Sequence, residues 1–301
     1  MSNAAVIQTS KLTKKNRIHE LDLEVREGEI YGFLGPNGAG KTTTLKMLLG
    51  LVKPSAGTIR IFGENPAKHR SAILRRTGSL IESPSYYGHL TGLENLRVVQ
   101  RLRDVPDKNV EEALRIVRLE KHRDKKAEAY SLGMKQRLGI AMALLSFPKL
   151  LILDEPTNGL DPAGMEELRE LIRSFPERFG MTVLLSSHLL PEIEQIATSV
   201  GILNEGRLVF QGSLESLRAR NRGELRIATG DNAAAAELLT TRGLRPELRE
   251  GRLVLGPLAD RDVAEINRLL VARGIPVTRI EERKKTLEEM FLELTGRERS
   301  L

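Results

Sequence analysis

A glycine-rich segment near the start of the chain has residue types and spacing that could bind phosphate groups. It fits the pattern G-x-x-x-x-G-K-[ST], in which backbone N–H groups surround a phosphate and the lysine reaches the terminal phosphates. The matching residues are Gly35, Pro36, Asn37, Gly38, Ala39, Gly40, Lys41 and Thr42, and we include the next residue, Thr43, in the expected site. The Thr42 hydroxyl is left to hold a magnesium ion. A glycine-rich turn before a helix is the alternative interpretation.

Two adjacent acids, Asp154 and Glu155, follow directly on the apolar run Leu150–Leu153. Hydrolysis of a bound nucleotide needs a metal ligand and a group that activates water, and both are expected at the end of a buried strand near the phosphate loop. We therefore expect Asp154 to hold Mg²⁺, directly or through water, and Glu155 to polarise the attacking water. The alternative is that the two acids cap the following helix.

The phosphate loop needs a strand before it and a helix after it. Residues 30–34 predict a buried strand, and residues 42–49 predict a helix that ends at Gly50. Further buried strands are predicted at 150–153 and 182–187. Strand-like and helical patterns alternate from the start to about Leu217, which predicts an α/β domain with parallel strands, a P-loop NTPase cassette at 1–217.

A helical subdomain and a second domain are also predicted. Residues about 83–146 show mostly helical patterns, and the spacing of Thr91 and Glu94 is that of a capping box at a helix start. Residues 218–223 are charged and offer little to bury, so we interpret them as a linker. The order of strand and helix patterns at 224–301 predicts a small α+β module of ferredoxin-like type. In its last helix, residues 286–294, an apolar stripe indicates core packing, with a partner site as the alternative.

Composition excludes several classes of protein. The chain has 301 residues, of which 40% are hydrophobic and 29% charged, and no cysteine. Disulfides, thiolate metal sites and cysteine nucleophiles are therefore excluded. We expect no signal peptide and no membrane span, because the longest apolar stretch, residues 138–153, is interrupted and too short. The net charge of +7 is compatible with binding to nucleic acid, with binding to an anionic membrane surface, or with no specific partner. Because basic and acidic residues are interleaved, an ordinary solvated surface is favoured.

Three further motifs give the chain a resemblance to a known family. Tyr130–Arg137 opens a predicted helix, Asn158–Asp161 follows Glu155 closely, and His188 follows the strand at 182–187. With these motifs the segment from Val6 to Gly212 resembles the ATP-binding subunit of an ABC transporter. By this resemblance Ser131 begins the signature motif, Asp161 lies in the D-loop and His188 is the switch histidine. The nucleotide-binding residues that it implies in the signature and D-loop are Ser131, Gly133, Gln136 and Asp161. Taken singly, Ser131 and Asp161 could be helix caps, and His188 could be a strand-end imidazole with its hydrogen bonds satisfied.

The resemblance implies a mechanism and partners. Two cassettes pair head to tail, so Ser131 of one chain meets the terminal phosphate held by Lys41 of the other, and ATP with Mg²⁺ joins the dimer until hydrolysis releases it. This chain has one cassette, so we expect a homodimer or a pair with a related chain. An integral membrane permease would bind near Tyr86 and Tyr87, unless these two side chains only pack in the helical section. The expected location is the cytoplasmic face of the cell membrane, with no direct contact to nucleic acid.

Two departures from the family pattern stand out. Glu82 replaces the usual glutamine that senses the metal and the permease, and this variant resembles bacitracin- and lantibiotic-resistance exporters, as does the closing segment at 286–296. We include Glu82 among the expected metal ligands, with a solvated acid at a strand end as the alternative. The family usually has an aromatic residue that stacks on adenine, and residues 14–19 contain none. Arg17 or His19 would have to stack in its place.

Two other functions were weighed. A non-transport ABC ATPase acting on ribosomes or DNA fits less well, because the chain has one cassette and no long coiled coil between Lys41 and Ser131. A module that binds ATP without hydrolysing it conflicts with the presence of Glu155. The resemblance therefore implies the ATPase subunit of an exporter, and its likeness to the bacitracin- and lantibiotic-resistance group implies efflux of antimicrobial peptides or drugs.

Overall fold

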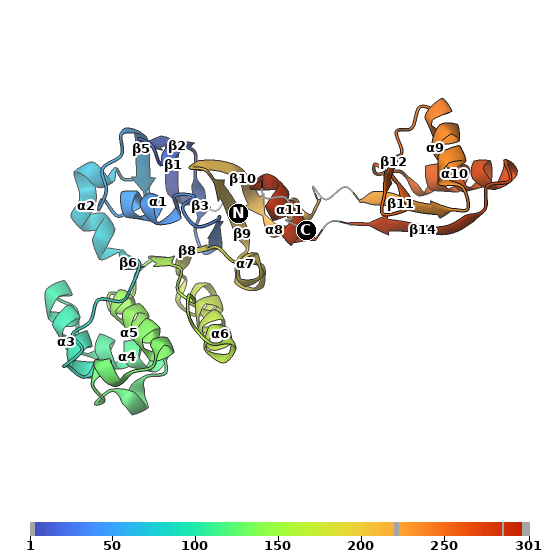
Figure 1. Ribbon diagram of the computed structural model, residues 1–301. Helices are drawn as coiled ribbons and strands as arrows, with labels where there is room; N and C mark the ends of the chain where they lie inside the picture. Colours follow the sequence, from blue (N-terminus) through green and yellow to red (C-terminus); the bar gives the residue numbers. More distant parts are fainter. Residues whose placement is uncertain (1–3, 220–222, 285, 297–301) are drawn as a thin grey trace. The chain divides into compact units, whose positions relative to one another are not determined.

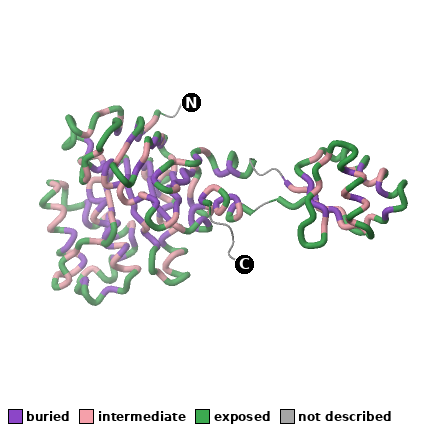
Figure 2. Tube along the Cα trace, turned by 45° about the horizontal axis from the view of Figure 1, so that its top comes forward, coloured by how far each residue is buried: buried purple, intermediate pink, exposed green. Residues whose placement is uncertain are grey.

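The computed structural model describes residues 4–219, 223–284 and 286–296 (Figure 1). It divides into two compact units, one made of the described residues up to Leu214 together with those from Glu293 onward, and one of Glu215–Leu292. Buried residues run through the central elements of the larger unit, and the smaller unit has its own buried set (Figure 2). Each unit thus has a separate hydrophobic core.

A six-stranded sheet forms the centre of the larger unit. Five of its strands are parallel, and β10 is antiparallel to its neighbour β9. The order is β10 (Arg207–Ser213), β9 (Ser199–Asn204), β4 (Ile30–Leu34), β8 (Thr182–Ser187), β7 (Leu150–Asp154) and β6 (Thr77–Leu80). Every residue of β4, β7 and β8 is buried, as the continuous apolar runs predicted. Because these strands are parallel, the segments that follow Leu34, Asp154 and Ser187 lie at one edge of the sheet.

The first part of the chain differs from the predicted alternation of strands and helices. Strands β1 (Ala5–Lys14), β2 (Ile18–Leu21) and β3 (Glu24–Arg26) follow one another without a helix, and β5 (Ala56–Ile61) joins them in an antiparallel sheet. The prediction of parallel strands from the start of the chain was therefore wrong here. For β1, β2 and β3 the connections are short, and short connections permit only antiparallel neighbours, whereas parallel pairing requires a long crossover. Side chains of both sheets and of α1 (Lys41–Leu48) share one core.

Helices surround the parallel sheet and form a separate section between β6 and β7. The predicted helical section contains α3 (Gly92–Arg103), α4 (Lys108–Ile116) and α5 (Leu132–Leu144), which pack against one another, and the 3-10 turns Glu120–His122 and Ala127–Ala129. The capping box at the start of α3 is confirmed, since Thr91 Oγ1 accepts from Glu94 N and Thr91 N donates to the Glu94 carboxylate. The remaining helices of this unit are α2 (Pro66–Arg75), α6 (Pro162–Phe179) and α7 (Leu190–Ile196).

The smaller unit contains a four-stranded antiparallel sheet and two helices between α8 (Leu214–Ala219) and α11 (Leu287–Leu294). Its elements are β11 (Glu224–Thr229), α9 (Asn232–Thr241), β12 (Glu247–Arg249), β13 (Arg252–Leu255), α10 (Asp260–Ala272) and β14 (Val277–Arg283), with sheet order β12-β13-β11-β14. Strand β12 was missed because all three of its residues are exposed. Helix α8 includes two residues of the predicted linker, and residues 220–222 lie outside the described residues. The ferredoxin-like assignment and the boundaries 1–217 and 224–301 stay predictions.

Candidate active site

The glycine-rich loop connects β4 to α1, as its pattern predicted. Gly40 precedes the helix with φ 108°, a backbone conformation that favours glycine, and it provides no side-chain cap for the first turn. The free N–H groups of that turn therefore remain available to an anion. Lys41 is 5% exposed, and its Nζ donates to the carbonyl oxygens of Gly35 at 2.7 Å and Pro36 at 3.3 Å. These two carbonyl groups hold the ammonium group over the loop.

The acidic end of β7 meets the start of α1. Thr42 Oγ1 donates to Asp154 Oδ2 at 2.8 Å, and Ser186 Oγ on β8 donates to Asp154 Oδ1 at 2.6 Å. The same Ser186 hydroxyl accepts a hydrogen bond from Glu155 N at 3.0 Å. Both carboxylate oxygens of Asp154 are thus oriented, and the residue as a whole is 3% exposed. Ser186 is a site residue that the motifs did not identify.

Glu155 lies between two basic groups. Its Oε1 is 3.2 Å from Lys41 Nζ, and its Oε2 contacts His188 Nδ1. The Glu155 backbone has φ 47°, which is uncommon for a residue with a Cβ and is found repeatedly at active sites. The structure therefore brings together Lys41, Glu155 and His188, from three segments far apart in the sequence. The contact with Glu155 also satisfies one hydrogen bond of the imidazole, so the switch role of His188 stays a prediction.

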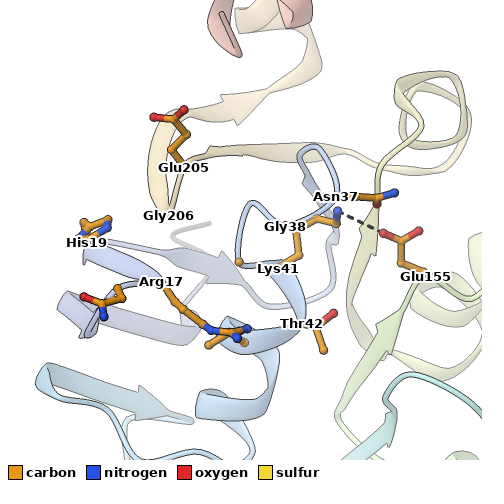
Figure 3. A pocket seen from close by; sticks show the side chains of 12 residues that line it. Arg17, His19, Asn37, Gly38, Lys41, Thr42, Glu155, Glu205 and Gly206 are labelled. Carbon is orange, nitrogen blue, oxygen red and sulfur yellow. Dashed lines mark ion pairs between the residues drawn. The ribbon is translucent and has the colours of Figure 1, made fainter. Parts of the chain in front are cut away.

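A cavity of about 650 Å³ opens beside these groups (Figure 3). Its walls include seven predicted site residues, namely Asn37, Gly38, Gly40, Lys41, Thr42, Thr43 and Glu155. Gly35, Pro36 and Ala39 do not line it. The first two supply the carbonyl groups that hold Lys41, and Ala39 is buried.

The far side of the cavity comes from other segments. Arg17 and His19, the candidates for adenine stacking, line it with Asn16, Glu205 and Gly206. The last two form the turn between β9 and β10, and only the three-dimensional pairing of these strands brings them here. Gly206 N donates to Ala39 O at 3.0 Å, and His19 N donates to Gly206 O at 2.8 Å, so the turn is bonded to the phosphate loop on one side and to β2 on the other.

The predicted signature and D-loop residues line a different cavity. Ser131, Gly133 and Asp161 line a hollow of about 510 Å³ in which neither Lys41 nor Thr42 takes part. Ser131 and Asp161 also act as helix caps, with Met134 N 3.3 Å from Ser131 Oγ and Gly164 N 3.0 Å from Asp161 Oδ1. Within one chain, these residues and the phosphate loop therefore belong to separate sites.

Gln136 and Glu82 are among the predicted site residues that line neither cavity. Gln136 is buried, and its Oε1 has no hydrogen-bond partner within the described residues. Glu82 follows β6 with φ 61°, and its carboxylate pairs with Lys46 on α1 at 2.6 Å. Its side chain is 64% exposed. The described contacts thus connect Glu82 to Lys46, and a role as a metal ligand stays a prediction.

The donor set around Thr42 suits a hard divalent ion. A hydroxyl oxygen and a carboxylate oxygen lie 2.8 Å apart at Thr42 and Asp154, and Mg²⁺ binds through one or two such groups together with substrate phosphates. No cluster of three or more His, Cys, Asp or Glu side chains that could hold a metal by itself occurs among the described residues. These residues therefore fit an ion that arrives with a nucleotide. In the described part of the chain, no helix is long and apolar enough to cross a bilayer.

Comparison with known proteins agrees with this geometry. Residues 18–158 match the family model described as "ABC transporter". The chain is 43% identical to the bacitracin transport ATP-binding protein BcrA of Bacillus licheniformis, over 97% of this chain and 98% of that protein. It is 42% identical to the lantibiotic transport ATP-binding protein SrtF of Streptococcus pyogenes, over 66% of this chain and 85% of that protein.

A solved structure of an ATP-binding subunit of an ABC transporter superposes with a TM-score of 0.64 and 32% identity, covering 71% of this chain and 92% of that one. The resemblance and the cassette fold predicted from the sequence are confirmed. The chain belongs to the ATP-binding subunits of ABC transporters, and it is an ATPase.

Proposed function

We propose that Lys41 binds the terminal phosphates of ATP and that Glu155 polarises the water that attacks the last phosphate. The observation that carries this proposal is the position of the Glu155 carboxylate, 3.2 Å from Lys41 Nζ and in contact with His188. A group that activates water must lie beside the group that holds the phosphate. His188 orients the carboxylate through Nδ1, which is the role we assign to it.

Thr42 and Asp154 would hold Mg²⁺ through Oγ1 and Oδ2. When bound, the ion offsets negative charge on the phosphate oxygens. Asp154 is ready to bind it because Ser186 fixes the other carboxylate oxygen at 2.6 Å. Because Glu155 N bonds to the same hydroxyl, Ser186 also fixes the backbone from which the Glu155 side chain extends.

Two copies of the chain would complete each ATP site. Ser131 and Asp161 line a cavity apart from Lys41 in the same chain, so their contact with phosphate requires a second subunit. Ser131 begins helix α5, and the free N–H groups of a helix start favour an anion. A head-to-tail homodimer would hold one ATP at each of its two interfaces.

The transported substance is inferred from the relatives. Two of them are named for bacitracin and lantibiotic transport, so we assign export of an antimicrobial peptide through a separate integral membrane permease. The present chain would bind this permease at the cytoplasmic face of the membrane. Tyr87 is 56% exposed, and we assign Tyr86 and Tyr87 to the permease contact. Relatives named as transport proteins do not favour the ribosome or DNA alternative.

A mixing experiment tests the shared site. Lys41→Ala removes the phosphate-binding half and Ser131→Arg blocks the opposite half, so each variant alone should not hydrolyse ATP. A pair with one chain of each kind retains one intact site, so the mixed sample should regain activity. Lys41→Ala mixed with Glu155→Gln is the matched control and should stay inactive, because both changes lie in the same half. An inactive first mixture would contradict the dimer, and wild-type hydrolysis by Lys41→Ala would contradict the site.

A further inference from the structure

A tight turn places Arg17 at the entrance of β2. Arg17 N donates to Lys14 O at 2.9 Å, and Asn16 takes the left-handed conformation with φ 63°. Asparagine tolerates this conformation better than most residues with a side chain. Lys14 pairs directly with Ile18 across the two strands. The short connection therefore fixes Arg17 as the last residue before β2, in the segment that has no aromatic residue.

The backbone of Arg17 is packed between two glycines of the nucleotide cavity. A Cβ atom on Gly206 would lie 2.3 Å from Arg17 O, and one on Gly40 would lie 3.2 Å from the same oxygen and 2.4 Å from Ile18 Cδ1. At Gly206 a side chain would clash with this backbone oxygen, and at Gly40 the φ of 108° itself favours glycine. Arg17 is thus held against Gly40, the residue that precedes the phosphate-binding helix, and its position relative to Lys41 is fixed by the fold.

The Arg17 side chain supplies a cation that has no partner among the described residues. It lines the cavity with Lys41, Thr42 and Thr43, and Figure 3 shows it extending toward the start of α1. Within the described residues it has no ion pair and no side-chain hydrogen bond. The charge of Lys41, by contrast, is partly balanced by Glu155 at 3.2 Å. A guanidinium group presents several donors in a plane that matches phosphate oxygens.

We propose that Arg17 binds the phosphate groups of the nucleotide, as a second cation beside Lys41, instead of stacking on adenine. This inference rests on the proposed function, in which the triphosphate lies on the phosphate loop. Affinity would then come mainly from the triphosphate, and the protein would discriminate weakly between ATP and GTP. The contribution of Arg17 would also decrease with salt, because its side chain is exposed.

The test compares the binding of Mg·ATP, Mg·GTP and inorganic triphosphate to the full chain by calorimetry. Arg17→Ala should weaken all three by about fivefold at low salt, the size expected for a solvent-exposed charge contact. Lys15→Ala is the matched control, because Lys15 is exposed in the same turn and does not line the cavity. It removes the same charge and should change none of the three affinities. Thermal unfolding without nucleotide should be the same for both variants.

Each outcome decides the inference. Equal weakening of ATP and triphosphate by Arg17→Ala alone supports the phosphate contact. If Arg17→Ala weakened ATP binding but left triphosphate binding unchanged, Arg17 would contact the base and the inference would be overturned. It would also be overturned if Arg17→Ala changed none of the affinities, or if Lys15→Ala changed them equally. If the wild-type chain bound none of the three, the proposed function itself would fail. Wild-type binding that is lost in Lys41→Ala establishes the site independently of Arg17.

Discussion

Ser186 offers a sharp test of how the catalytic carboxylates are held. Its hydroxyl is fully buried, donates to Asp154 Oδ1 at 2.6 Å and accepts from Glu155 N at 3.0 Å. Ser186→Ala removes one hydrogen bond to a charged group and one between neutral groups. Such bonds contribute about 1.5–3 and about 0.5–1.5 kcal/mol, so the free energy of unfolding should fall by about 3 kcal/mol. Urea unfolding without nucleotide measures this loss.

The same substitution should also alter the dependence of ATP hydrolysis on magnesium. Without Ser186 Oγ, Asp154 keeps only the Thr42 hydroxyl as a side-chain partner among the described contacts, so its carboxylate is less well oriented. Loss of such an outer partner typically weakens metal binding by about 10- to 100-fold. The Mg²⁺ concentration that gives half-maximal hydrolysis at fixed ATP should rise accordingly.

Ser187 provides a matched control on the same strand. Its hydroxyl, also buried, donates to Glu192 Oε2 at 2.7 Å and accepts from Leu189 N at 3.0 Å. Ser187→Ala should therefore cost about the same free energy of unfolding, about 3 kcal/mol, without changing the magnesium dependence. The assignment of Ser186 to Asp154 would be refuted if both variants shifted the magnesium dependence equally. It would also be refuted if Ser186→Ala changed neither the free energy of unfolding nor the magnesium dependence.

Three further expectations concern other contacts. Glu155→Gln should leave ATP binding intact and slow hydrolysis by roughly 10²–10⁴-fold in a turnover assay, because an amide cannot accept the proton; an unchanged rate would remove Glu155 from this role. Lys46→Met and Glu82→Gln should show a coupling of at most about 1 kcal/mol in a double-mutant unfolding cycle, since the Glu82 carboxylate is solvent-exposed. Glu82→Gln should also change the stimulation of hydrolysis by the permease. A strong coupling, or unaltered stimulation, would contradict these assignments. The pKa of Glu94 is lowered mainly by the Thr91 backbone hydrogen bond, so its contribution to stability is present above the unfolded pKa and is lost as pH falls through the folded pKa. Thr91→Ala keeps this backbone bond but removes the one that Thr91 Oγ1 donates to the Glu94 carboxylate, the second cause of the lowered pKa. The substitution should therefore lower stability more at about pH 7 than at about pH 3, and equal losses at both would count against this side-chain bond.

The sequence by itself determined the cassette and most of its local structure. Continuous apolar runs indicated β4, β7 and β8, because a strand buried on both faces has no polar alternation. The phosphate loop and the pair Asp154–Glu155 were identified because each motif is contiguous. The chemistry of each motif depends on residues that are neighbours in the chain, so the spacing of residue types alone was sufficient to propose both motifs.

Only the tertiary structure decided which distant groups meet. The bonds from Ser186 to Asp154, from Glu155 to His188 and from the 205–206 turn to the phosphate loop join residues far apart in the chain. No local pattern encodes such contacts, because they depend on the order in which the strands pair. The antiparallel pairing of β5 with β1, which lies across β4 and α1 in the chain, was missed for the same reason. The separation of Ser131 from Lys41 into two cavities likewise follows from where parallel strands and helix starts lie in space, and not from spacing along the chain.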